Sequence, residues 1–411
     1  MPFTASPRYK WYVVAMLWWI AFFNYADRQA IFSVFPLLEK RFHLGPVELG
    51  LLGSSFAWVY GLCSPLAGII VDMVRRKTAI LGGLQAWSLI CMATASSMNF
   101  GTLMFFRAAE GLGETFYFPA SVSLVSAYHG PETRSRALGF HQTSVYIGTI
   151  GGGFFAGLIG QYYGWRWSFI LFGGLGCILG LVLRRWLLEP PRALAPTGHY
   201  RTALRVIFTQ PAPFFLMGGF LCANFVALVL LSWMPKFLNQ EFKLDLAASG
   251  LAATVFVQLA SMCSSPLGGW WADLWRRRSN AGRMHVQAIG LLCGAPFVAL
   301  CGYTRSIPVL IVALTAWGFF KGLYDANIFA SMFDVVPPEA RGSAAGFMNM
   351  VGWLGGGAAP FVVGLVAKAY SLGLAISLAA GVYLLGAIFL AMAGWTVPGD
   401  YFTTRGPSSR P

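Results

Sequence analysis

Long apolar segments recur along the whole chain, and they constrain its fold more than any other feature. About twenty apolar residues in a helix are needed to cross the roughly 30 Å hydrocarbon core of a bilayer. Hydropathy places such segments at 11–35, 47–72, 78–97, 99–127, 134–160, 165–188, 211–238, 246–272, 284–303, 307–332, 340–369 and 371–396. The sequence therefore predicts an all-α membrane protein with twelve transmembrane helices.

Composition supports the membrane as the surrounding medium. Hydrophobic residues make up 57% of the 411 positions, charged residues only 11%, and the mean hydropathy is +0.63. A soluble protein of this size needs more charge to cover its surface. The seven cysteines lie inside or at the ends of the predicted spans without C-x-x-C spacing, which is typical of packing residues. We expect neither a metal nor a cofactor.

The net charge of +14 follows from where the basic residues lie. If the spans alternate, most of the 29 Lys and Arg fall on the side that carries both termini. Basic residues concentrate in cytoplasmic loops, so we expect both termini in the cytoplasm and the chain in the cell (inner) membrane. Anionic lipid headgroups are sufficient partners for this charge, and nucleic acid is not expected.

Two blocks of sequence repeat without a gap. Residues 64–77 (SPLAGIIVDMVRRK) end the second predicted span, and residues 265–278 (SPLGGWWADLWRRR) end the eighth. Six spans separate the blocks, which indicates a parallel repeat of two halves. We therefore predict two pseudo-symmetric six-helix bundles, residues 1–188 and 211–411. A Pro- and Arg-rich cytoplasmic linker, 189–210, joins them, and a short cytoplasmic tail ends the second bundle.

The chemistry of these two gating blocks can be read from their residue types. Glycine lets two helix ends approach closely, the acid one turn later lies at the water interface, and the basic residues anchor the loop. One interpretation is a latch between the halves, and the other is a stop-transfer anchor alone. The Asp in both copies favours the latch. The residues concerned are Gly68, Asp72, Arg75, Arg76, Gly269, Asp273 and Arg276.

These blocks resemble the signature loop of the major facilitator superfamily, although Met73 and Arg75 depart from its usual pattern. Within that superfamily, Asn24-Tyr25-Ala26-Asp27-Arg28 resembles the first helix of the anion:cation symporter family. So do the segments at 107–120 and 233–238. The segment Gly111-Leu112-Gly113-Glu114 has a weaker resemblance to the spinster-like lipid transporters. The resemblance implies the superfamily fold of twelve helices.

Ionisable residues inside the first half's predicted spans are the main candidates for function: Asp27, Arg28, Arg107, Glu110 and Glu114. Such residues are costly in hydrocarbon unless they are paired or in a watery cavity. Arg107 and Glu114 are two helical turns apart and share a face, and Glu110 lies a turn from each. Arginine can hold a carboxylate through two parallel hydrogen bonds.

The family resemblance implies a role for each of these groups. It implies that Arg28 binds substrate, that Asp27 and Glu114 handle protons, and that Arg107 is a coupling partner. The alternative is that Asp27–Arg107 and Arg28–Glu114 are salt bridges that only hold helices together. Glu110 is assigned to proton coupling, with a packing ion pair as the equal alternative.

The second half carries fewer charges. Lys321 stands at the position equivalent to Glu110, and Asp325 follows one turn later, so the two could simply pair. Otherwise Lys321 is a second anchor for an anionic substrate. Polar and aromatic residues predicted to line the cavity with Arg28 and Lys321 are Tyr60, Gln142, Tyr146 and Asn349.

These features predict a gradient-driven transporter. The sequence has no nucleophile elbow, metal cluster or phosphate loop, so we do not expect an enzyme. A two-fold repeat matches alternating access better than a channel. The leading hypothesis is proton-coupled symport of a small organic anion, a sugar acid or another carboxylate, by a monomer. Sodium coupling stays open, and the alternative function is spinster-like, proton-coupled export of a lysophospholipid or sphingolipid.

Overall fold

The computed structural model describes residues 8–189, 200–337 and 340–397, and within them the chain is helical with short connections. The first half forms α1 (Tyr9–Ser33), α2 (Phe35–Phe42), α3 (Pro46–Met73), α4 (Arg76–Thr94), α5 (Phe100–Glu114), α6 (Tyr117–Tyr128), α7 (Pro131–Tyr163) and α8 (Trp165–Trp186). The second half forms α9 (Tyr200–Thr209), α10 (Pro211–Glu241), α11 (Leu246–Arg276), α12 (Gly282–Tyr303), α13 (Ile307–Asp325), α14 (Ile328–Val335), α15 (Arg341–Ala369) and α16 (Leu372–Trp395). Part of the predicted linker, 190–199, lies outside the described residues.

The predicted spans correspond to one long helix each, or to two consecutive helices. In the described residues, nine segments are long and apolar enough to cross a membrane by themselves, and only three of them lie in the first half. The first-half spans that fall short are α1, α4 and the α5–α6 pair. Charged residues lower the hydropathy of α1 and α5, and the α5–α6 span is broken between Glu114 and Tyr117. The weakest hydropathy therefore coincides with the predicted charged site.

Several helices begin where a polar side chain caps free backbone N–H groups. Asn99 and Thr102 form a capping box at the start of α5. Asp245 accepts a hydrogen bond of 2.7 Å from the backbone N–H of Ala248 at the start of α11, and Ser371 accepts one of 3.2 Å from Leu374 at α16. Such caps satisfy donors that the first helical turn leaves without partners.

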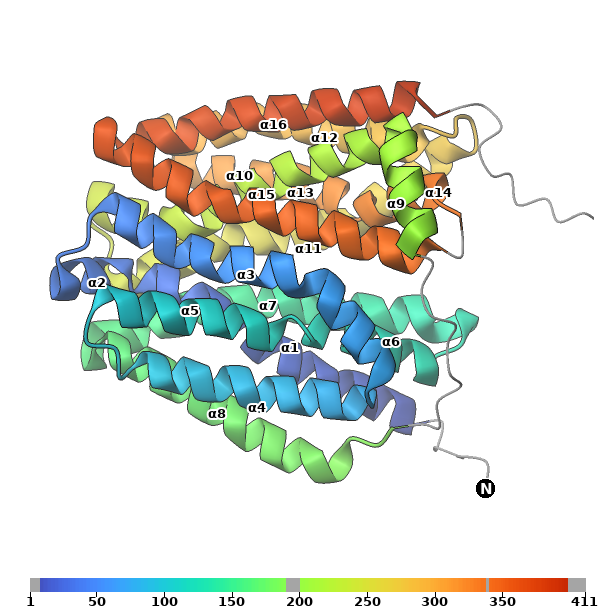
Figure 1. Ribbon diagram of the computed structural model, residues 1–411. Coiled ribbons are helices and arrows are strands. Elements are labelled where there is room, and N and C mark those ends of the chain that lie inside the picture. The colour runs from blue at the N-terminus through green and yellow to red at the C-terminus, as the bar shows by residue number, and fades with distance from the viewer. Residues whose placement is uncertain (1–7, 190–199, 338–339, 398–411) are drawn as a thin grey trace, which may run out of the picture.

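The helices of the two halves lie side by side as two groups, with α3 packed on α15 and α7 packed on α11 (Figure 1). The fit is close enough to require glycine. A Cβ atom on Gly50 would lie 2.4 Å from the carbonyl oxygen of Pro360, and one on Gly250 would lie 2.0 Å from that of Gly153. These contacts join the halves near the ends of the helices that neighbour α2. The exact domain boundaries stay a prediction.

An ion pair also joins the halves at the α2 end. The Nζ atom of Lys236 in α10 lies 2.9 Å from Oε2 of Glu39 in α2, and Lys236 is buried. At the opposite end, where α1 begins and α16 finishes, Met73 is 80% exposed. A Cβ atom on Gly139 or Gly346 would meet nothing within 4 Å there. The halves are thus in contact at one end and less tightly packed at the other.

Candidate functional site

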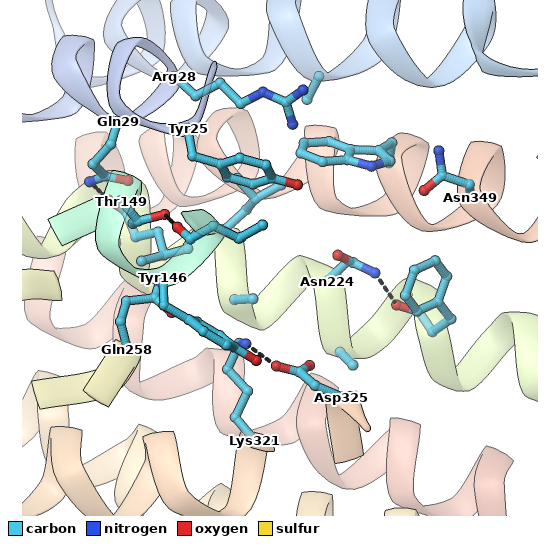
Figure 2. A pocket seen from close by; sticks show the side chains of 18 of the residues that line it. Tyr25, Arg28, Gln29, Tyr146, Thr149, Asn224, Gln258, Lys321, Asp325 and Asn349 are labelled. Atoms are coloured by element: carbon cyan, nitrogen blue, oxygen red, sulfur yellow. Dashed lines mark hydrogen bonds and ion pairs between the residues drawn. The ribbon is translucent and has the colours of Figure 1, made fainter. Parts of the chain in front are cut away.

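A cavity of about 440 Å³ lies between the two halves. The side chains that line it come from α1, α3, α7, α10, α11, α13, α15 and α16. Figure 2 shows Arg28 and Lys321 on opposite sides of this cavity. All six residues predicted for substrate binding contribute to its wall: Arg28, Tyr60, Gln142, Tyr146, Lys321 and Asn349. Residues from positions as far apart as 28 and 349 therefore share one site.

Aromatic rings surround the guanidinium group of Arg28. Its Cζ atom lies 4.7 Å from the ring centre of Tyr25, 5.1 Å from Phe56, 4.6 Å from Tyr60 and 5.3 Å from Trp353. These rings come from α1, α3 and α15, so both halves fix the position of Arg28. Aromatic faces attract cations, most strongly where water is excluded.

Arg28 is also paired with a carboxylate. Its Nε donates to Oε2 of Glu114, which is fully buried, while Nη1 of Arg28 has no hydrogen-bond partner. One edge of the guanidinium is therefore used within the protein, and it retains a donor without a partner. A guanidinium in this arrangement can exchange an internal carboxylate for one from a ligand.

The second buried ion pair differs from the sequence-based alternative. Nη1 of Arg107 donates to Oε2 of Glu110 on the same helix, over 2.5 Å. The structure therefore has no Asp27–Arg107 salt bridge among its described residues. The other pair of that alternative, Arg28–Glu114, is present. Glu110 is three residues after Arg107, so a helical neighbour reaches Arg107 without any movement between helices.

Asp27 points to another group of buried side chains. Ligand atoms of Asp27, Cys91 and Glu110 all lie within 4.8 Å of one another, and Oδ1 of Asp27 has no hydrogen-bond partner. This spacing is short enough for a metal ion. The guanidinium of Arg107 already lies against Glu110, however, and a second cation there would be repelled.

A glycine positions these charges on α5. A Cβ atom on Gly111 would lie 2.5 Å from the carbonyl oxygen of Phe56 on α3, so only glycine allows this approach. The helix then breaks between Glu114 and Tyr117, and Thr115 in the break donates to the Gly111 carbonyl over 2.7 Å. The break places Glu114 at the end of α5, directly against Arg28 of α1.

The second half repeats this backbone arrangement with different chemistry. α13 ends at Asp325 and α14 begins at Ile328, at the same place in the fourth span of the half. Lys321 pairs with Asp325 one turn away, which is the simple pairing that the sequence allowed. Nδ2 of Asn327 donates to the carbonyl of Gly268 over 3.0 Å and so ties the break to α11.

The gating block of the second half forms its ion pairs within that half. Arg283 lies 2.7 Å from Asp273, and Arg276 lies 2.8 Å from Asp334. The expected close approach at Gly269 is absent, because a Cβ atom there would meet nothing within 4 Å. Gly268 makes the contact instead, since its Cβ would lie 2.6 Å from the Cα of Leu323.

The gating block of the first half is described only in part. Gly68 is half-buried and Arg75 is exposed. The backbone N–H of Arg76 donates to Oε1 of Glu189 over 2.7 Å, at the end of α8. The side chain of Asp72 lies outside what the structure describes. A latch between the halves at these blocks stays a prediction.

Several cavity residues were missed by the sequence prediction. Tyr25, Gln29, Phe56, Thr149 and Gln258 also line the cavity. Tyr25 and Gln29 are three residues before and one after Arg28, so helical spacing alone could have indicated Tyr25. Gln29 instead donates to the carbonyl of Leu231 in α10, over 2.9 Å.

Comparison with known proteins identifies the family. The model of the Major Facilitator Superfamily matches residues 17–360, with a second match over 237–411. The chain belongs to the major facilitator superfamily. It is therefore a multi-pass membrane transporter with the fold of that superfamily, and not an enzyme.

Three distant relatives each match more than four fifths of the chain. The D-galactonate transporter of Escherichia coli O6:H1 is 25% identical over 93% of this chain and 94% of its own length. The hexuronate transporter of Bacillus subtilis is 25% identical over 86% of this chain and 87% of its own. The protein spinster of Drosophila melanogaster is 26% identical over 88% of this chain and 62% of its own.

A solved structure shares the fold over nearly the whole chain. A bacterial homologue of the human lysosomal transporter spinster, in an inward-facing and occupied conformation, matches with a TM-score of 0.84 and 19% identity. The match covers 97% of this chain and 100% of that one. At 19% sequence identity, this match shows that the two proteins share a fold.

Proposed function

We propose that this superfamily member is a proton-coupled symporter of a small organic monoanion that carries hydroxyl groups, such as a sugar acid. The observation that carries the proposal is Arg28, which lies in the cavity wall within an aromatic cage and pairs with the buried carboxylate of Glu114. A guanidinium with an unpartnered donor is suited to bind a carboxylate. The galactonate and hexuronate transporters among the relatives are consistent with this cargo.

The size and lining of the cavity support a small polar cargo. About 440 Å³ lies within the range of roughly 300–1,000 Å³ that is usual for small-molecule sites. Amide side chains of Gln142, Asn224, Gln258 and Asn349 add donors and acceptors to the wall. Such groups can hydrogen-bond to the hydroxyls of a sugar acid.

The far wall favours one negative charge on the cargo. Lys321 is already neutralised by Asp325, so the two together present a donor and an acceptor and no free positive charge. A second carboxylate on the substrate would have to separate this pair or protonate Asp325. Hydroxyl groups can use the pair as it stands. An aldonate or a uronate therefore fits better than an aldarate with two carboxylates.

Coupling follows from competition for Arg28. When the carboxylate of the substrate binds the guanidinium, Glu114 loses its cationic partner. An unpaired carboxylate is costly in a buried site, so Glu114 takes up a proton. Substrate and proton then cross together as the halves rock about the cavity, with the chain in a cell membrane and its termini in the cytoplasm.

Transport into proteoliposomes tests this proposal. Adding galactonate or glucuronate to vesicles with a trapped pH dye should acidify the lumen and alkalinise the medium, and glucarate should give a much smaller response. Lysophosphatidylcholine in place of the sugar acid tests spinster-like lipid export. Proton movement with the lysolipid and none with any carboxylate would refute the proposal, and a response that requires a sodium gradient would reassign the coupling ion.

A further inference from the structure

A group of buried side chains lies behind Arg28 and is not used by the coupling step described above. It consists of Asp27 of α1, Cys91 of α4 and Glu110 of α5. A carboxylate oxygen of each acid and the Sγ atom of Cys91 lie within 4.8 Å of one another. Their exposed fractions are 2%, 0% and 0%. Bulk water is thus excluded from the space that the three residues share.

The charges of this region do not balance. It contains the guanidinium groups of Arg28 and Arg107 and the carboxyl groups of Asp27, Glu110 and Glu114. Glu114 pairs with Arg28, and Glu110 pairs with Arg107. Asp27 has no ion pair within the described part of the chain. Oδ1 of Asp27 and Oε1 of Glu110 are both buried without a hydrogen-bond partner.

Among the residues that the structure describes, no third cation pairs with these carboxyl groups. From α1, Tyr25 lies at Arg28, and from α3, Tyr60 lies at the same guanidinium. From α4, the thiol of Cys91 donates to the carbonyl of Phe169 in α8 over 3.5 Å. Lys321 belongs to the opposite wall and pairs with Asp325. Two carboxylates this close, out of water and with one guanidinium between them, cannot both ionise.

We infer that Asp27 and Glu110 share one proton, which stays bound through the transport cycle and is distinct from the proton that Glu114 carries. This inference deepens the proposed function and rests on it for the role of Glu114. A protonated carboxyl group gives the second one a hydrogen-bond donor, which satisfies an otherwise unpartnered oxygen.

The resident proton makes both loaded and empty states neutral. Without substrate, two guanidinium groups face three carboxyl groups that hold one proton between them, so the net charge is zero. With a bound monoanion and a protonated Glu114, the balance is again zero. Because the cluster is neutral in both states, the rocking of the halves moves no net charge across the membrane potential. One proton should therefore accompany each monoanion, and transport should respond weakly to membrane potential.

Infrared spectroscopy can detect the resident proton directly. Purified protein in a maltoside detergent, without substrate and near neutral pH, should show the carbonyl stretch of a protonated carboxyl group. Glu110→Gln should remove this band, because Arg107 then neutralises Asp27. Asp27→Asn should remove it too, because Glu110 keeps Arg107. Asp325→Asn is the matched control, because it removes a carboxyl group on the opposite wall of the cavity, and it should retain the band.

Several results would overturn the inference. They are the absence of such a band in the wild type, its survival in both Asp27→Asn and Glu110→Gln, and its loss in Asp325→Asn alone. If the variants do not fold, the proton-to-substrate ratio of the wild type decides, since a ratio of two means that the proton of the Asp27–Glu110 pair also moves. Substrate-driven alkalinisation without the band leaves the proposed function intact, whereas the band without alkalinisation refutes only the function.

Discussion

The fourth span of each half breaks at the same place, but different ionisable groups lie at the two breaks. α5 breaks into α6 after Glu114, and α13 breaks into α14 after Asp325. In the first half two buried guanidinium–carboxylate pairs and an additional acid lie around the break, with Arg28 and Asp27 supplied by α1. In the second half it carries one local pair, whose side chains are 14% and 28% exposed. A duplicated framework has thus kept its shape while the ionisable groups diverged.

This difference teaches where coupling can occur. A carboxylate that is exposed or paired with a neighbouring cation gains little stability from taking up a proton. A buried carboxylate without its own cation is costly, and taking up a proton removes that cost. The first half also contains the three spans with too little apolar length to stand alone, and two of these, α1 and the α5–α6 pair, carry the charged residues of the site. We therefore expect substitutions in the two halves to have unequal effects, and three experiments test that inequality.

The largest expected effect is that of Arg28→Ala. It removes the charge-assisted hydrogen bonds to the substrate carboxylate, each worth about 1.5–3 kcal/mol. Binding should weaken by roughly 30- to 140-fold for a loss of about 2–3 kcal/mol, which calorimetry with the best sugar acid would measure. Lys321→Ala is the matched variant in the second half and should bind more tightly than Arg28→Ala. Equal losses would end the distinction between the halves.

A more selective effect is expected at Glu114. Glu114→Gln removes the group that takes up the coupled proton but keeps its size. Counterflow exchange of labelled substrate should persist, while accumulation driven by a pH gradient should be lost. Asp325→Asn is the matched control at the equivalent break and should retain both activities. If Asp325→Asn loses accumulation and Glu114→Gln keeps it, the coupling residue lies in the other half.

The smallest effect is expected from removing the second half's ion pair entirely. The double variant Lys321→Gln, Asp325→Asn keeps hydrogen-bonding groups on the wall and leaves no charge unpaired. A partly exposed pair contributes about 1 kcal/mol or less, so affinity should change by less than about tenfold. Uptake measured against substrate concentration would show this. Loss of all transport would mean that Lys321 is an essential anion anchor.

Sequence alone determined the helical membrane fold, because apolar length is a local property that needs no tertiary information. The repeated blocks at 64–77 and 265–278 indicated the two related halves, and intramembrane charge indicated the site. All six residues predicted for substrate binding line one cavity for the same reason: polar groups in a bilayer must face an interior space.

The tertiary structure alone decided which charges pair. Arg107 could reach Asp27 across helices or Glu110 along its own, and only the relative placement of α1 and α5 separates these choices. Likewise, the Gly-Gly sequence at 268–269 left open which glycine contacts α13, and helix rotation assigns the contact to Gly268. Pairing depends on distances of a few ångströms between segments far apart in the chain, and local pattern carries no such distances.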